Sequence, residues 1–392
     1  MSANFGERLR EVRKRRGLSQ RELSELSGVS LSLIRKLEQG ERDDTRLETA
    51  RRLANVLKVP TTRLITEHAE AAADEETVHR WAPVHAALAA PPDLGGLSEE
   101  PTYGGVRDAL EAAVPLFAHD RFAELVAVLP PLLRDAEVLT ETDLRGRRLR
   151  ARLLELTGWL MTQTRQFDAA DLALERALDD AADRVQGAAT VSVQCWLLLR
   201  RGRLAEARAL AVEWADEVEP RMSRATPTEL SAWGWLLLRV SAAAIRDNRP
   251  GEAGDALRLA RSAAVALGEE CTPEGDFLRT FGPVTVALKR TENAMVAGRP
   301  DEVLSLAAKI PGDSLKPTSN NRNRHLLDVA GAQTQLRQYA EAVDTFNKIR
   351  VGSPQWLPNQ RYARDILVRI VSGRRTLTPE MRELADLVHL PV

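Results

Sequence analysis

The sequence predicts an all-α protein, in which an N-terminal domain of five helices is followed by a long series of helical hairpins. Apolar residues recur at spacings of three and four along almost the whole chain, the spacing of an amphipathic helix. Alternating patterns typical of strands are nearly absent, and proline and glycine fall mostly between the periodic blocks. With 392 residues, of which 44% are hydrophobic and 28% charged, the chain is expected to be globular with two or three domains.

Residues 1–65 form a compact basic head. Ser19 is an expected N-cap with Glu22 three residues later, which is a capping box, and Gly28 and Val29 form a tight turn. Ser30 is the next N-cap, and Gly40 ends that helix. We expect helices at about 5–16, 19–27, 30–39, 45–57 and from about 60 onward.

Residues 66–104 are interpreted as a connector, with a segment rich in Pro and Gly at 91–105 that we expect to let the head reorient. Residues 105–392 repeat one unit, an apolar helix, a short turn, and a second helix opened by Glu/Asp and Ala. Six turns lie at 119–125, 164–172, 201–210, 248–257, 298–306 and 337–346, and a further helix pair is expected at about 357–373 and 378–389. The body is therefore a predicted α-solenoid of about seven hairpins.

The net charge of −1 conceals an asymmetry, because residues 1–65 carry a net charge of +6 and the remainder carries −7. This distribution suggests that only the head meets a polyanion. On the third helix, Leu31 stacks with Arg35 and Ser32 with Lys36, away from the apolar side. Such a face fits the major groove of DNA, while helix N-termini, where Gln20 and Ser30 lie, favour phosphate contacts.

The segment LSQRELSELSGVSLSLIRKLEQGER resembles the Cro- and cI-repressor-like helix-turn-helix class, over about residues 5–65. The resemblance implies that Gln20 and Ser30 bind phosphate and that Leu31, Ser32 and Lys36 face bases. It also implies that Gln39 lies near the DNA backbone and that Arg35 contacts either phosphate or bases. Inside the domain it implies that Arg13 pairs with Glu38. Leu31 is apolar where many members have a polar residue, so the target sequence is not predicted. The alternative is a degenerate head kept for protein contacts.

The body resembles degenerate tetratricopeptide repeats, best at Leu154-x2-Thr157-Gly158-x2-Met161 followed by Ala170-x3-Leu174. The alternative is an irregular helical bundle. Stacked repeats make a concave groove lined by the first helix of each pair. Aligning the hairpins to the repeat pattern places residues of the first helices on this groove, and the segments 271–295 and 317–330 are further candidates. Together they give ten candidate effector-binding residues: Trp159, Gln163, Trp196, Arg200, Trp235, Arg246, Arg279, Asn293, Arg324 and Gln335. Each tryptophan could instead be part of the core between repeats.

The combination resembles the peptide-sensing tetratricopeptide regulators of Gram-positive bacteria and similar actinobacterial regulators. It implies a homodimeric transcriptional regulator that binds a double-stranded DNA operator and a peptide or small-molecule effector. The alternative is an adapter whose repeats recruit or restrain a partner protein on DNA.

The sequence has no Walker loop and no GxGxxG, GxSxG or HExxH motif, and its histidines lack zinc spacing. We therefore expect no enzyme, no cofactor and no metal. No apolar run approaches ~18 residues and no secretory signal is visible, so we expect a cytoplasmic protein without membrane contact.

Overall fold

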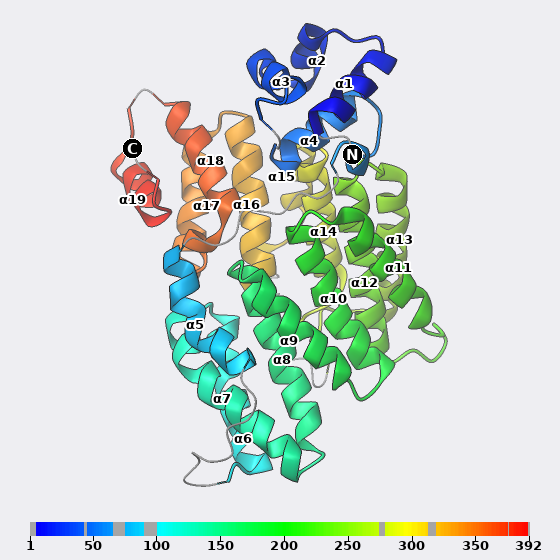
Figure 1. Cartoon of the computed structure of the whole chain (residues 1–392), viewed down its shortest axis with the longest axis vertical. Helices are drawn as coiled ribbons and strands as arrows, with labels where there is room; N and C mark the ends of the chain where they lie inside the picture. Colours follow the sequence, from blue (N-terminus) through cyan, green and yellow to red (C-terminus); the bar gives the residue numbers. More distant parts are fainter. Residues whose placement is uncertain are drawn as a thin grey trace.

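The computed structural model describes residues 5–42, 45–65, 75–89, 100–273, 279–312, 319–374 and 376–390, and within these ranges the chain is helical without a β-strand. Figure 1 shows the head lying across one end of the body helices. The head contains α1 (Phe5–Arg15), α2 (Gln20–Ser27), α3 (Leu31–Glu38) and α4 (Leu47–Val56), followed by the 3-10 turn η1 (Thr61–Arg63). The predicted fifth helix is thus a single turn within the described residues, and residues 66–74 lie outside them.

The helix boundaries in the head follow from its capping residues. The Ser19 hydroxyl accepts a hydrogen bond from the Glu22 amide at 3.1 Å, and the Glu22 carboxylate accepts one from the Ser19 amide at 2.7 Å. This is the predicted capping box, which satisfies two amides that the helix leaves unpaired. Gly28 ends α2 with φ +62°, a conformation that glycine adopts without strain. The apolar faces of the helices then meet in one core, which includes Leu9, Leu23, Ile34, Leu37 and Leu53.

In the described part of the chain the body contains seven successive helical hairpins, as the turn spacing predicts. Their helices are α6 (Tyr103–Ala118), α7 (Phe122–Thr142), α8 (Gly146–Gln163), α9 (Phe167–Asp179), α10 (Arg184–Arg200), α11 (Leu204–Glu217), α12 (Pro227–Arg246), α13 (Pro250–Leu267), α14 (Pro283–Val296), α15 (Pro300–Ala307), α16 (Ser319–Gln335), α17 (Tyr339–Gly352), α18 (Arg361–Ser372) and α19 (Pro379–Leu387). A short 3-10 turn, η3 (Leu357–Asn359), precedes α18.

The first six hairpins share one turn geometry. The middle residue of each three-residue turn has a φ between +54° and +76°, at positions Asp120, Arg165, Gly202, Asn248, Gly298 and Arg337. In each turn the next amide bonds to a carbonyl five residues back, as Gln166 does to Met161 at 2.8 Å. This pattern satisfies the last carbonyls of the first helix and directs the second helix back along it.

Part of the range interpreted as a connector is a packed helix, α5 (Glu75–Ala89). Trp81 is 1% exposed and meets the Phe122 ring edge-on, with 6.2 Å between ring centroids. Val84 and Leu88 are buried in the same cluster. The segment 75–89 therefore belongs to the folded body, and of the predicted flexible segment 91–105, residues 91–99 lie outside the described part of the chain.

The two ends of the hairpin series meet. Residues of α5–α9 and of α16–α19 form one continuous apolar cluster, whereas residues of α10–α14 form most of a second. The Ala123 amide, at the start of α7, donates to the Gln355 side chain at 3.0 Å. The body thus closes around its concave side, and in Figure 1 α5 lies next to the lower end of α17. Among the described helices none has the length and apolarity required to span a membrane.

Candidate functional site

The third helix of the head presents a polar face to solvent. Ser32, Arg35 and Lys36 are exposed and Leu31 is half-buried, whereas Ile34 and Leu37 on the opposite side are fully buried. Ser30 caps α3, with its hydroxyl accepting from the Leu33 amide at 3.3 Å. Of the seven predicted DNA-contacting residues, Ser30, Leu31, Ser32, Arg35, Lys36 and Gln39 therefore lie at or beside this helix. Arg35 and Lys36 are both exposed, so both cations face solvent.

Gln20, the seventh predicted residue, has a partner inside the head. Its amide nitrogen donates to the Glu38 carboxylate at 2.8 Å, and the side chain is half-buried. Glu38 also accepts two hydrogen bonds from Arg13, at 2.6 and 2.7 Å, which is the ion pair implied by the family resemblance. A further bond joins Arg13 to the Leu18 carbonyl at 2.7 Å. This cluster ties α1, α2 and α3 together and holds the recognition face in place.

The buried Glu38 stays ionised because of these partners. Burial alone would raise the pKa of Glu38, but hydrogen bonds from Arg13 and Gln20 and the charges of Arg13 and Arg10 together lower it below its usual value. The same hydrogen bond raises the pKa of Arg13, against the effect of burial.

The head is docked on the turn between α12 and α13. The Thr61 hydroxyl donates to the Arg246 carbonyl at 2.9 Å, and the Thr62 amide donates to the Asp247 carboxylate at 2.9 Å. From the body side, the Asn248 amide nitrogen donates to the Val59 carbonyl at 3.2 Å. Because these bonds involve backbone groups on both partners, they fix the position of η1 relative to the end of α12.

A second contact joins α4 of the head to α18 of the body. Arg46 pairs with Asp365 at 2.7 Å, and Arg369 pairs with Glu48 at 3.0 Å. Both pairs are partly exposed, so each contributes little free energy, typically about 0–1 kcal/mol. The head thus spans the concave side of the body between α12 and α18.

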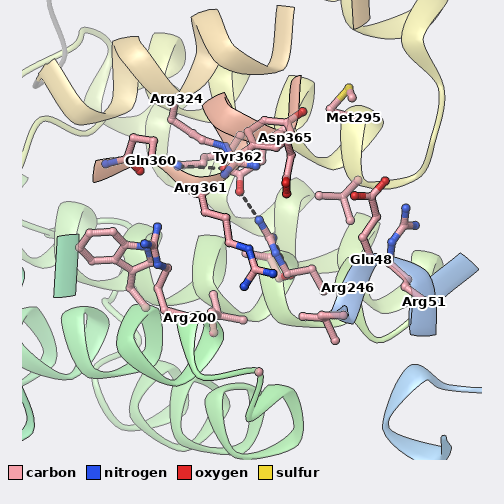
Figure 2. Close-up of a pocket in the computed structure, with 18 of the residues that line it drawn as sticks. Glu48, Arg51, Arg200, Arg246, Met295, Arg324, Gln360, Arg361, Tyr362 and Asp365 are labelled. Atoms are coloured by element: carbon pink, nitrogen blue, oxygen red, sulfur yellow. Dashed lines mark hydrogen bonds and ion pairs between the residues drawn. The ribbon is translucent and has the colours of Figure 1, made fainter. Parts of the chain in front are cut away.

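A cavity of about 1110 Å³ lies under the head. Its walls come from the first helices of six hairpins, α8, α10, α12, α14, α16 and α18, together with α4 of the head. Figure 2 shows Arg246, Arg324 and Arg361 at the cavity, with Glu48 and Arg51 of the head at its side. The concave surface that the repeat register predicts is therefore present, and the head covers part of it.

Eight of the ten candidate effector-binding residues line this cavity. They are Trp159, Trp196, Arg200, Trp235, Arg246, Arg279, Arg324 and Gln335. Gln163 and Asn293 do not line it. Gln163 is 1% exposed and donates to Asp120 at 3.0 Å, and Asn293 donates to the Ser241 hydroxyl at 2.8 Å. Both side chains lie near the end of a first helix, where they bond to the neighbouring hairpin or helix instead of facing the concave side.

The cavity has an aromatic wall. Trp159 of α8 and Trp196 of α10 are half-buried, and their rings pack with 6.4 Å between centroids. Trp235 is more enclosed, at 3% exposed, and donates to the Thr280 carbonyl at 3.2 Å. The Arg239 guanidinium lies 5.1 Å above its ring. The first two tryptophans therefore retain accessible ring surface, whereas the third is largely committed to the core.

A network of ion pairs occupies the floor between α12, α14 and α16. Glu292 pairs with Arg246 and, at 3.1 Å, with Lys289. Burial alone would raise the pKa of Glu292, but these cations and Arg324 hold it well below its usual value. Arg324 pairs in turn with the buried Asp328 at 3.3 Å and lies over the Tyr362 ring at 4.7 Å. These ion pairs join three cations, Arg246, Lys289 and Arg324, to two carboxylates, so the cations are in excess.

Sequence reasoning missed several residues of the cavity wall, among them Arg51, Arg239, Arg361 and Tyr362. Arg51 belongs to the head and Arg361 to the last hairpin, so no pattern within one repeat could assign them to the concave surface. Arg239 lies one turn after Trp235 on α12, and extending the same helical face would have found it.

Helix α2, the turn at Gly28 and helix α3 form a helix-turn-helix arrangement. A helix-turn-helix family model matches residues 9–64. The chain is similar to two proteins of Bacillus subtilis (strain 168), at 45% identity over 56 residues to the uncharacterised HTH-type transcriptional regulator RghRB and at 40% over 57 residues to the HTH-type transcriptional repressor RghR. Each match covers 14% of this chain, and the chain spans 40% and 42% of the two relatives. No solved structure matches the chain.

Proposed function

We propose that the protein is a sequence-specific DNA-binding transcriptional regulator. The observation that supports this most is the face of α3, where Ser32, Arg35 and Lys36 are exposed on a helix held by the Arg13–Glu38 cluster. In this proposal α3 enters the major groove, Lys36 and Arg35 reach guanine or phosphate, and Ser30 bonds a phosphate at the N-terminus of α3. Leu31, Ser32 and Gln39 contact base edges or the adjacent backbone. The two relatives are a transcriptional regulator and a transcriptional repressor by name, which supports the same function.

The body acts in this proposal as a tetratricopeptide-like sensor that also mediates dimerisation. Two heads of a dimer would engage half-sites about one helical turn of DNA apart. The effector would bind in the cavity under the head, against Trp159, Trp196 and the surrounding arginines. An effector changes DNA binding only if its affinity differs between two arrangements of head and body.

A specific observation favours a small ligand over recruitment of a partner protein. The cavity of about 1110 Å³ is partly covered by the head and is close in size to the roughly 300–1,000 Å³ typical of small-molecule sites. An adapter that holds a protein segment would need an open groove. The adapter function is therefore the second candidate.

The test is an in vitro selection on fragments of the native genome with full-length protein. The comparison is a variant with Leu31, Ser32, Arg35 and Lys36 all changed to Ala, whose positions lie outside the buried core. Enrichment of a two-fold symmetric site that the variant loses is the expected result. Enrichment that is the same with both proteins would refute the proposed reading face.

A further inference from the structure

The cavity under the head is strongly cationic in a chain whose net charge is −1. Its described lining contains twelve arginines and one lysine but only four carboxylates, those of Glu48, Glu155, Glu292 and Asp365. Each of these carboxylates already pairs with an arginine or lysine of the same lining. Among the described lining residues, thirteen cationic side chains therefore face four carboxylates.

Three of the lining arginines come from different elements around the cavity and form no ion pair with any described carboxylate. They are Arg51 of the head, Arg239 of α12 and Arg361 of α18. Arg239 donates to the Ser192 carbonyl and hydroxyl at 2.8 and 3.2 Å. Burying a cation without a counter-ion is costly, and it is favourable only when something supplies the opposite charge.

Burial lowers the pKa of two of these arginines, Arg239 and Arg51. Burial and the charges of nearby Arg279 and Arg246 lower the pKa of Arg239 to about 10, against the opposing effects of Cys195 and Glu292. Burial also lowers the pKa of Arg51; Glu48 opposes this, while Arg246 and Arg52 add to it. Arg51 belongs to the head and Arg246 to the body, so like charges face one another across the cavity.

Beside this charge lies accessible ring surface. Trp159 and Trp196 are half-buried on the wall formed by α8 and α10, with Leu156 and Val193 next to them. A flat ring stacks well on such tryptophans, and a guanidinium such as that of Arg200 binds anions through a planar set of donors. The cavity therefore combines an aromatic wall with a cationic floor and roof.

We propose that the cavity binds a low-molecular-weight organic anion that carries two or more negative charges and a flat ring, and that this ligand contacts head and body at once. The inference deepens the effector-binding part of the proposed function and rests on it. The ring lies against Trp159 and Trp196, and the anionic groups lie between Arg361 and Arg246 of the body and Arg51 of the head. The anionic groups of such a ligand attract the arginines of both head and body, which otherwise repel one another, so the ligand holds the head against the body.

The test is a fluorescence titration of full-length protein, without DNA, with two dyes. Bis-ANS carries two sulfonates on flat rings, and N-phenylnaphthylamine has a similar ring system without charge. The variants are Arg361→Gln and Arg51→Gln, neither of which breaks an ion pair among the described residues. The matched control is Arg148→Gln, an exposed arginine of α8 outside the cavity. Circular dichroism melting of each variant checks that it folds.

We expect bis-ANS to bind the wild-type protein more tightly than the neutral dye, and each cavity variant to raise the Kd for bis-ANS by about tenfold, the effect of losing one charge-assisted contact. Arg148→Gln and the neutral dye should show no such change. Salt should weaken the binding of bis-ANS. Adenosine triphosphate should displace bis-ANS more effectively than adenosine, which lacks the charge, or inorganic triphosphate, which lacks the ring.

Equal binding of the two dyes, or unchanged binding by both cavity variants, would overturn the inference. If inorganic triphosphate displaced bis-ANS as well as adenosine triphosphate does, the ligand would not need a flat ring, and that part of the inference would be wrong. If hexaglutamate displaced bis-ANS more strongly than adenosine triphosphate does, the ligand would be an acidic peptide instead. The outcome is separate from that of the DNA selection. If an operator is selected but dye binding does not depend on the arginines, the proposed DNA-binding function stands and the anion site is refuted. If dye binding depends on the arginines but no operator is selected, the anion site stands and the proposed DNA-binding function is refuted.

Discussion

Replacing Glu38 by Gln should destabilise the head much more than a surface substitution of the same kind. The Glu38 carboxylate accepts three hydrogen bonds, at 2.6, 2.7 and 2.8 Å, from Arg13 and Gln20. Its side chain is 2% exposed and that of Arg13 is 9% exposed. The neutral amide introduced by Glu38→Gln would leave the Arg13 guanidinium buried without its counter-ion, and breaking a buried pair in this way typically costs about 3–5 kcal/mol.

The assay is amide hydrogen exchange of the full-length protein, read by mass spectrometry on peptides from α1, α2 and α3. A loss of about 3 kcal/mol corresponds to exchange at least about 100-fold faster in these helices. The control is Glu11→Gln, because the pair that Glu11 forms with Arg15 has side chains that are 52% and 64% exposed. Removing such a surface pair should cost less than about 1 kcal/mol. If both variants accelerated exchange equally, the cluster would not hold the three helices together.

Acid should reproduce the effect of this substitution. The folded pKa of Glu38 lies below its unfolded value of about 4.3, so its contribution to stability is complete above that pH and is lost as the pH falls through the folded pKa. Exchange in α1–α3 of the wild-type protein should therefore accelerate in that range, after correction for the intrinsic exchange rate. The Glu38→Gln variant should lack this component.

Three further predictions concern DNA recognition and the body. Lys36→Ala should lower specific DNA affinity by roughly 1–3 kcal/mol and relax selectivity at one base pair, measured by competition binding; an unchanged preferred site would count against the α3 face. Burial, with a smaller effect of a nearby lysine, lowers the pKa of His325 to about 4, so the free energy of unfolding should fall by at most about 3 kcal/mol as the pH drops from about 6.5 to about 4. In thermal melts, His325→Gln should reduce this pH-dependent decrease in the free energy of unfolding, and an equal decrease in the variant would refute its assignment to His325. The raised pKa of buried Asp328 acts in the opposite sense in both proteins. Gly234→Ala would place a Cβ well inside van der Waals contact with the fully buried Phe281 ring and should cost about 1–3 kcal/mol by overpacking, seen as a lower melting temperature; an unchanged midpoint would show that the ring moves freely.

The sequence predicts the local structure of this protein well because its signals are local. Ser19, Glu22 and Gly28 specify the ends of α2 by hydrogen bonds and backbone conformation that need no distant partner. The hairpin turns are recognisable for the same reason. The helix α5 was not predicted, since Pro83 and a charged segment obscure its periodicity, and its burial depends on Phe122, which lies in a later helix.

The cavity was predictable only in part. Trp159 and Trp196 occupy equivalent positions in successive hairpins, so a repeat register places both on the concave side. The register fails for Gln163, because the side chain bonds to Asp120 of the preceding hairpin. The register does not predict that Arg51 and Arg361 line the cavity, because their positions depend on how the head and the last hairpin lie over the concave surface.

The bonds between the head and the turn that follows α12 make that helix a lever arm. The head is bonded to residues 246–248, at the C-terminal end of α12, and the helix has 20 residues. At about 1.5 Å per residue it is about 30 Å long, so a tilt of about 5° around its far end would displace the head by about 2.6 Å. A change of packing too small to alter the hairpins themselves would thus be magnified into a shift comparable to the spacing between stacked base pairs.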